Sequence, residues 1–227
     1  KNTEGRILYV SPSDLDSTDS ISNQGNSLAR PFKTLQRALI ESARFSYIKG
    51  NSNDETEKTT ILLMPGEHVI DNRPGYTIDS GGTVTTADGS TVRSLPLTLD
   101  SVFDLTQKDN DLYKFNSVNG GVIVPRGTSI VGLDLRKTKL RPLYVPNPTD
   151  DSVPYSSLFR ITGACYLWQF SIFDASEFET VYTQNNDFTA KSSPTFSHHK
   201  LTVFEYADGV NEVGTKGLTD LQMYYAK

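Results

Sequence analysis

Carboxylates are the side chains of this sequence that could most directly carry acid–base chemistry. Hydrolysis of a glycosidic bond needs two carboxyl groups that face one groove, several ångströms apart. The candidate sets are Asp174 with Glu177 and Glu179, and Glu205 with Asp208. Each set lies in a loop-like polar stretch, where carboxylates are normally solvated. We therefore predict no catalytic residue in this chain.

Metal binding would need a different cluster of acidic or imidazole ligands. Asp14, Asp16 and Asp19 lie close in sequence, but no glycine stands at the EF-hand position and no distal glutamate follows. A solvated acidic loop is the preferred interpretation. His198 and His199 are adjacent, so on a strand they point to opposite faces and do not easily bind one ion. The sequence predicts neither a metal site nor a cofactor.

Aromatic side chains gather in one short segment and offer a binding chemistry instead. On a strand, Tyr166, Trp168 and Phe170 would share one face, and Leu167 would lie on the other. If Trp168 faces outward, its ring could stack on a sugar or anchor a partner chain. The alternative is that these rings fill the core. The candidate contact residues for a glycan or a partner are Trp168, Tyr166 and the later Tyr206.

The composition limits what kind of protein positions these residues. The chain has 227 residues, of which 36% are hydrophobic, and this is typical of one globular domain. Its 22 basic and 27 acidic residues are scattered, which argues against a nucleic-acid partner. Apolar runs such as 61–64 are too short for membrane insertion. The single cysteine, Cys165, excludes an internal disulfide framework and is expected to be a buried apolar residue.

The first fifty residues suggest a strand, a loop and a helix. Residues 7–10 form a short apolar run, and a polar stretch follows over 11–26. From Pro31 the spacing of apolar residues becomes helical, and Pro31 suits the first helical position. Arg30 would then be the N-cap, although arginine is a poor capping residue. We predict a helix over 31–47 whose apolar residues are Phe32, Leu35, Leu39 and Ala43.

An irregular repeat follows the helix. Each copy has an apolar run, a glycine and another apolar residue three positions after the glycine. The second and third copies continue with two alternating apolar positions that indicate a further short strand, and these are Leu133 and Leu135 in one and Phe170 and Ile172 in the other. The three copies are Ile61-Leu62-Leu63 with Gly66 and Val69, Val122-Ile123-Val124 with Gly127 and Ile130, and Leu158-Phe159 and Ile161 with Gly163 and Tyr166.

This pattern favours an all-β fold, a right-handed parallel β-helix with an N-terminal capping α-helix and long loop insertions. No copy could bury its apolar residues alone, whereas stacked coils form one interior and pair the backbone groups. Right-handed winding is expected from parallel crossovers generally. An antiparallel sandwich with long loops is the alternative. We expect one domain over 1–227, with the cap in 1–50, coils in 59–217 and insertions at about 71–120, 143–157 and 174–196.

Two resemblances add to this interpretation. The segments 9–11, 25–27 and 31–39, with Asp16 between them, resemble the first strand, loop and capping helix of pectate-lyase-like β-helix proteins. That family places its active site along the middle coils, where only Arg160 and Lys200 are candidate bases and no matching carboxylates accompany them. The segments 153–163, 196–201 and 204–210 are similar to virion structural proteins of T4-like marine cyanophages. This resemblance implies a tail, fibre or baseplate-associated component located in the virion.

Two functions follow as hypotheses. The first is a structural and recognition module of the virion, with other virion proteins as partners and a host-surface polysaccharide as a possible ligand. The second is a tailspike-like enzyme on the same scaffold, a polysaccharide lyase or glycoside hydrolase. Because apolar residues concentrate at 218–225 without a visible cap, we also expect the chain to be a fragment of a longer protein. Further chain or a homotrimer would then cover that end.

Overall fold

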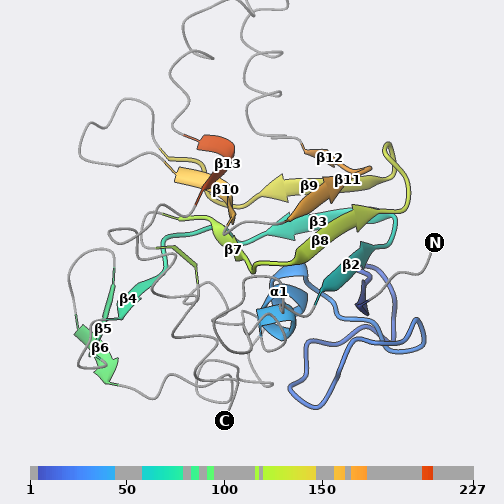
Figure 1. Cartoon of the computed structure of the whole chain (residues 1–227), viewed down its shortest axis with the longest axis horizontal. Helices are drawn as coiled ribbons and strands as arrows, with labels where there is room; N and C mark the ends of the chain where they lie inside the picture. The colour runs from blue at the N-terminus through green and yellow to red at the C-terminus, as the bar shows by residue number, and fades with distance from the viewer. Residues whose placement is uncertain are drawn as a thin grey trace, which may run out of the picture.

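The computed structural model describes residues 5–43, 58–78, 83–86, 91–94, 116–117, 120–146, 156–161, 165–172 and 201–206. Strands are the main regular structure of these residues, and parallel pairing dominates (Figure 1). The chain begins with strand β1 (Arg6–Val10), followed by helix α1 (Leu35–Ala43). The remaining strands are β2 (Thr59–Leu63), β3 (Gly66–Ile70), β4 (Tyr76–Ile78), β5 (Thr83–Thr86), β6 (Thr91–Ser94), β7 (Val122–Val124), β8 (Thr128–Gly132), β9 (Thr138–Pro142), β10 (Ser156–Ile161), β11 (Tyr166–Trp168), β12 (Ser171–Ile172) and β13 (Leu201–Tyr206).

Three parallel sheets contain most of the strands. Sheet one has the order β1-β2-β8-β11, sheet two has the order β3-β9-β12, and sheet three has the order β7-β10-β13. From β2 onward the parallel strands return to the three sheets in a fixed cycle: sheet one, then sheet two, then sheet three. Each sheet therefore gains one strand on each pass of the chain.

The strands of sheet one alternate between buried and partly exposed residues, as period-two geometry requires. Inward residues form rows across the strands, such as Leu8, Ile61, Ile130 and Leu167, which pair in register. The first three of these are fully buried, and Leu167 packs against the same core from a partly exposed position. Sheet three differs, because every described side chain of β7 and β10 is buried. The core thus lies between the inner faces of the three sheets.

The three copies of the sequence repeat do not all occupy the same sheets. Strands β7 and β10 pair with each other, and so do β8 and β11, so the second and third copies occupy the same sheets. Their residues three positions after the glycine do not match, because Ile130 pairs with Leu167 and Tyr166 pairs with Ser129. The first copy is displaced by one sheet, because Ile61 pairs with Ile130 and not with Val122. Every corner needs an apolar strand, a turn and another strand, so the local pattern does not reveal which corner it forms. Gly66 and Gly127 both have positive φ, which confirms the predicted glycine turns.

The prediction of a strand at the alternating apolar positions after the second glycine was also wrong. Leu133 and Leu135 are about half exposed in the connection between β8 and β9. Asp134 forms this turn, since its side chain accepts hydrogen bonds from the backbone N–H groups of Arg136 and Lys137. These hydrogen bonds hold the pKa of the Asp134 carboxyl below its usual value. The following strand instead buries Leu140.

Helix α1 begins at Leu35, four residues later than the predicted start at Pro31. Thr34 is the N-cap, because its hydroxyl accepts a hydrogen bond of 3.2 Å from the backbone N–H of Arg37. Phe32 lies before the helix in a parallel bridge with Val10 of β1. Residues 44–47 of the predicted helix lie outside the described residues. The apolar residues Phe32, Leu35 and Leu39 are all buried.

Helix α1 contacts one edge of the strand arrangement. It touches β1, β3 and β7, which are the edge strands of the three sheets, and also β2. All nine of its residues are buried, so its polar side chains need partners. Gln36 donates to the carbonyl oxygen of Asp71, and the hydroxyls of Ser42 and Thr128 form a hydrogen bond. The helix is thus fixed to the sheets by polar contacts as well as by apolar packing.

The predicted insertion over 71–120 contains an antiparallel sheet in its described part. Strands β4, β5 and β6 pair in sequence order and lie away from the parallel strands (Figure 1). Their residues are rich in threonine and valine, which favour strands. The parts of the predicted insertions at 147–155 and 174–196 lie outside the described residues.

Candidate functional site

Tyr166 and Trp168 project from the outer face of β11, the edge strand of sheet one. Their side chains are 51% and 53% exposed. The two rings stack with a centroid separation of 5.8 Å and an interplanar angle of 16°. The indole N–H of Trp168 donates a 3.1 Å hydrogen bond to Oε1 of Gln169. The outward alternative for Trp168 therefore holds, and core filling does not.

Phe170 does not share the face of this aromatic pair, which corrects the period-two expectation. Strand β11 ends at Trp168, and Gln169 has a φ of 61°, which turns the backbone. Phe170 consequently packs against the core, as do Leu167 and Ile172. The turn lies close to Gly132 of β8, where any larger side chain would collide with the carbonyl oxygen of Gln169. The bend at Gln169 thus isolates Tyr166 and Trp168 as an exposed pair.

Tyr206, the third predicted contact residue, lies elsewhere. It ends β13 in sheet three and pairs in register with Ile161, a residue of the core. The pair Tyr166 and Trp168 belongs to sheet one, so the described strands bring two of the three predicted contact residues together. Only the backbone of Tyr206 is described.

The outer face of sheet one extends the aromatic pair across three more strands. One row in register joins Tyr9, Leu62, Val131 and Trp168. The neighbouring row joins Ile7, Thr60, Ser129 and Tyr166. All eight side chains are at least partly exposed, and none carries a charge.

The outer face of sheet two has the opposite character. It exposes Glu67 of β3 and Lys139 of β9, which pair in register. Arg141 also lies there, and its Nε atom is 2.6 Å from Oε1 of Glu67. This face is a solvated, charged surface of the usual kind.

The structure does not describe the side chains of the carboxylates considered for hydrolysis. Asp174, Glu177, Glu179 and Asp208 lie outside them. Glu205 is in β13, and its backbone pairs in register with Arg160 of β10. Three further predicted polar residues lie outside the described ranges. They are the candidate base Lys200 and the adjacent histidines His198 and His199.

Arg160 itself is not placed to act as an accessible base. Its side chain is buried, and its Nε atom lies 3.5 Å from the carbonyl oxygen of Gly120. A base that removes a proton from a polymeric substrate must reach that substrate. The buried position therefore favours a structural role for Arg160.

The acidic residues of the first loop have separate structural roles. Asp14 is exposed and accepts a 2.9 Å hydrogen bond from the backbone N–H of Asp16. Asp19, predicted to be solvated, is instead buried. Its carboxylate accepts the backbone N–H groups of Lys33 and Thr34 at 2.8 and 3.0 Å and the Thr34 hydroxyl at 2.7 Å. No group of three potential metal ligands forms within the described ranges.

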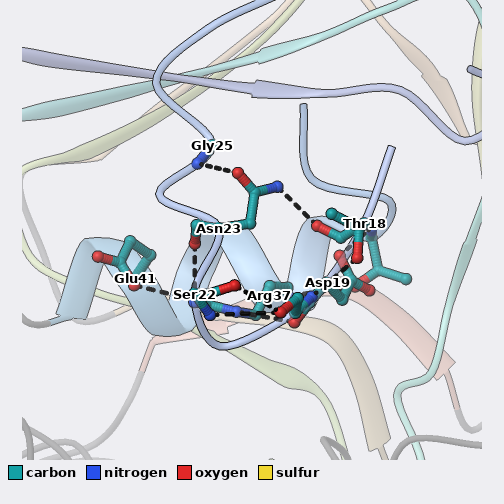
Figure 2. A network of polar contacts seen from close by, with 9 residues as sticks. Thr18, Asp19, Ser22, Asn23, Gly25, Arg37 and Glu41 are labelled. Carbon is teal, nitrogen blue, oxygen red and sulfur yellow. Dashed lines mark hydrogen bonds and ion pairs between the residues drawn. The ribbon is translucent and has the colours of Figure 1, made fainter. Parts of the chain in front are cut away.

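A buried polar network joins this loop to α1 (Figure 2). The guanidinium of Arg37 is fully buried, lies 2.9 Å from Oε2 of Glu41 and donates to the carbonyl oxygens of Asp19 and Asn23. Its Cζ atom also lies 4.6 Å from the centroid of the Phe32 ring. Burial raises the pKa of Asp19, although hydrogen bonds from Thr34 and Lys33 and the charge of Arg37 oppose that effect.

Asn23 and Gly25 complete the loop around this network. The Asn23 amide donates to the carbonyl oxygens of Thr18 and Pro31 at 2.7 and 3.1 Å and accepts from the backbone N–H of Gly25. Gly25 has a φ of 62°, and any side chain there would collide with the ring of Phe32. The loop, the cap residue and the helix therefore form one interlocked unit.

His68 is a buried titratable residue that sequence analysis missed. It faces inward on β3, in register with Leu140, and its Nε2 atom is 2.8 Å from the carbonyl oxygen of Met64. Its Nδ1 atom has no hydrogen-bond partner in the described part of the chain. Burial lowers the pKa of His68, and no charged side chain contributes to the shift. The alternation of β3 was the available signal, because it places position 68 on the same face as Ile70.

No family model, no curated protein and no solved structure matches this chain. Among the described helices and strands, no helix is long and apolar enough to span a membrane. Function must therefore be inferred from the site itself.

Proposed function

We propose that this chain is a structural and recognition module of a bacteriophage virion, in a tail, fibre or baseplate-associated position. Its scaffold is a right-handed parallel β-helix, and its exposed aromatic pair contacts a host-surface glycan. The resemblance of three segments to cyanophage virion proteins gives the setting. The exposed stack of Tyr166 and Trp168 is the observation that carries the recognition role.

The strand order supports the β-helix. Successive parallel strands visit three sheets in a constant cycle, which is the path of a chain that winds around one interior. Helix α1 contacts the first strand of each sheet, where an uncapped coil would expose apolar residues and unpaired backbone groups. Parallel crossovers are almost always right-handed, which gives the direction of winding.

The aromatic pair supports recognition because its exposure has no structural explanation. Tryptophan and tyrosine side chains are highly or moderately buried on average, and both rings would gain free energy by leaving water. Flat apolar faces with a polar tip are suited to stacking on sugar rings and to anchoring partner chains. A homotrimer, as in many closed assemblies, is the proposed oligomer.

Glycan cleavage stays an alternative prediction. The carboxylates that would carry it, apart from the backbone position of Glu205, lie outside the described residues. No described feature favours it over recognition.

Binding to envelope polysaccharide purified from a marine cyanobacterium tests the proposal. We expect the purified chain to bind, and Trp168→Ala to weaken binding about tenfold or more, as for a central aromatic anchor. Leu143→Ala, which alters a half-exposed residue outside the pair, is the matched control and should bind like the wild type. Equal binding by all three proteins would contradict the recognition role. Release of reducing ends during the same incubation would favour the enzyme instead.

A further inference from the structure

The outer face of sheet one has an amphipathic pattern that runs across its four strands. We name the row Tyr9, Leu62, Val131 and Trp168 the apolar ladder. Beside it, Thr60, Ser129 and Tyr166 present hydroxyl groups at consecutive register positions, and we name this row the hydroxyl ladder. The side chains of Thr60 and Ser129 are partly exposed.

We propose that this face binds a linear, uncharged glycan that lies across the four strands, along the direction in which the strands stack. This inference rests on the proposed function and specifies its ligand. A pyranose ring offers an apolar C–H face together with hydroxyl groups at its edge. The apolar ladder would contact the C–H face, and the hydroxyl ladder would form hydrogen bonds with the hydroxyl groups of the sugar.

The direction follows from the spacing of the ladders. Adjacent strands lie about 4.8 Å apart, so the path from Tyr9 to Trp168 spans about 14 Å. Each of the strands β2, β8 and β11 adds one apolar and one hydroxyl position to this path. Strand β1 adds Tyr9 to the apolar ladder, but Ile7, which pairs with Thr60, has no hydroxyl group. A sugar unit in an extended chain is comparable in length to one strand spacing. Successive sugar units could therefore meet equivalent contacts.

The lack of charge specifies the kind of glycan. A uronate polymer would bring a carboxylate to each unit, and its desolvation needs a cationic or hydrogen-bonding partner. None of the eight outward residues of sheet one is basic. Sheet one therefore suits a neutral glycan better than an acidic one.

A protein partner fits this face less well. Two packed protein surfaces exclude water from their centre, and a buried hydroxyl without a partner there lowers the affinity. The hydroxyl ladder lies directly beside the apolar ladder, so a purely apolar partner would leave Thr60 and Ser129 unsatisfied. A second copy of this chain bound to the same face is the competing outcome, and light scattering detects it.

Calorimetric titration of the full chain against defined oligosaccharides tests the inference. The neutral probes are glucose, mannose and galactose oligomers of two, four and six units, and the acidic probe is oligogalacturonate of the same lengths. We expect a neutral oligomer to bind, with affinity rising from two to four units and levelling at six. Leu62→Ser should weaken that binding about tenfold, as loss of one apolar contact does. Leu143→Ser, at a half-exposed leucine beside Ile70 of sheet two, is the control and should have no effect.

Several results would overturn the inference. They are preference for the acidic oligomers, equal effects of Leu62→Ser and Leu143→Ser, independence of length, and no binding of any neutral oligomer. Light scattering that shows self-association lost in Leu62→Ser would assign the face to a second copy instead. The proposed function fails separately, if envelope polysaccharide does not bind. Loss of that binding in Trp168→Ala but not in Leu62→Ser would retain the proposed function and reject the ladders.

Discussion

Two regions of the molecule place side chains in unusual environments. Where α1 meets the preceding loop, the charged residues Asp19, Arg37 and Glu41 are buried, and each has polar partners within hydrogen-bond distance. On the outer face of sheet one, Tyr166 and Trp168 are half exposed and stack on each other. The buried charges are explained by the fold, because they fix the loop and the helix together. The exposed rings are not, so they are the better indication of function.

Replacing Arg37 should have the largest effect and tests the structural half of this comparison. Arg37→Ala leaves the buried carboxylate of Glu41 without its ion pair, and the carbonyl groups of Asp19 and Asn23 without a donor. Removing one partner of a buried pair typically costs about 3–5 kcal/mol. Chemical denaturation should show this loss in the free energy of unfolding. The double variant Arg37→Met with Glu41→Leu removes both charges and should be more stable than Arg37→Ala. The reverse order would show that the pair is not coupled.

Leu35→Ala tests whether α1 covers the edge of the sheets. Leu35 is buried on a helix that touches the edge strand of every parallel sheet. We expect a loss of about 2–5 kcal/mol in the free energy of unfolding, from the lost burial and the cavity left behind. Leu15→Ala, at a fully exposed leucine of the preceding loop, is the matched control. If both variants unfold at the same denaturant concentration, the helix does not cover the core.

His68 gives a pH-dependent prediction with a smaller effect. Because burial lowers its pKa in the folded chain, the unfolded chain binds more protons below the ordinary value of 6.5. Stability from His68 is therefore complete above pH 6.5 and declines as the pH falls through and below that value. Asp19, whose folded pKa is raised, acts in the opposite direction above its ordinary value of 3.8. The difference between the wild type and His68→Gln isolates the histidine, and an identical pH profile for both would contradict its assignment.

Much of the scaffold was predictable from local patterns, but its long-range order was not. Apolar runs followed by glycine turns identified β2, β3, β7 and β8, although Val69, the apolar residue predicted after Gly66, is 39% exposed. The displaced first repeat was missed, since each corner requires the same pattern whichever sheets it joins. The start of α1 was missed because Phe32 satisfies the helical spacing although it pairs with Val10 in an extended conformation.

The candidate site was predictable in part. The period of β11 placed Tyr166 and Trp168 together, but single-sequence reasoning could not decide which face was inward. The bend at Gln169 was invisible, because a non-glycine residue rarely has positive φ. The ladders were also invisible, since Tyr9 and Trp168 are joined only by strand pairings that are distant in sequence.

Trp168→Ala tests the central claim most directly, because stability and binding can be measured on the same sample. An exposed residue that serves recognition should change the free energy of unfolding by no more than about 0.5 kcal/mol. Binding to envelope polysaccharide should nevertheless be largely lost. This result would separate the exposed rings from the buried network of Arg37. A clear drop in stability with polysaccharide binding intact would contradict the account, because Trp168 would then be a structural residue.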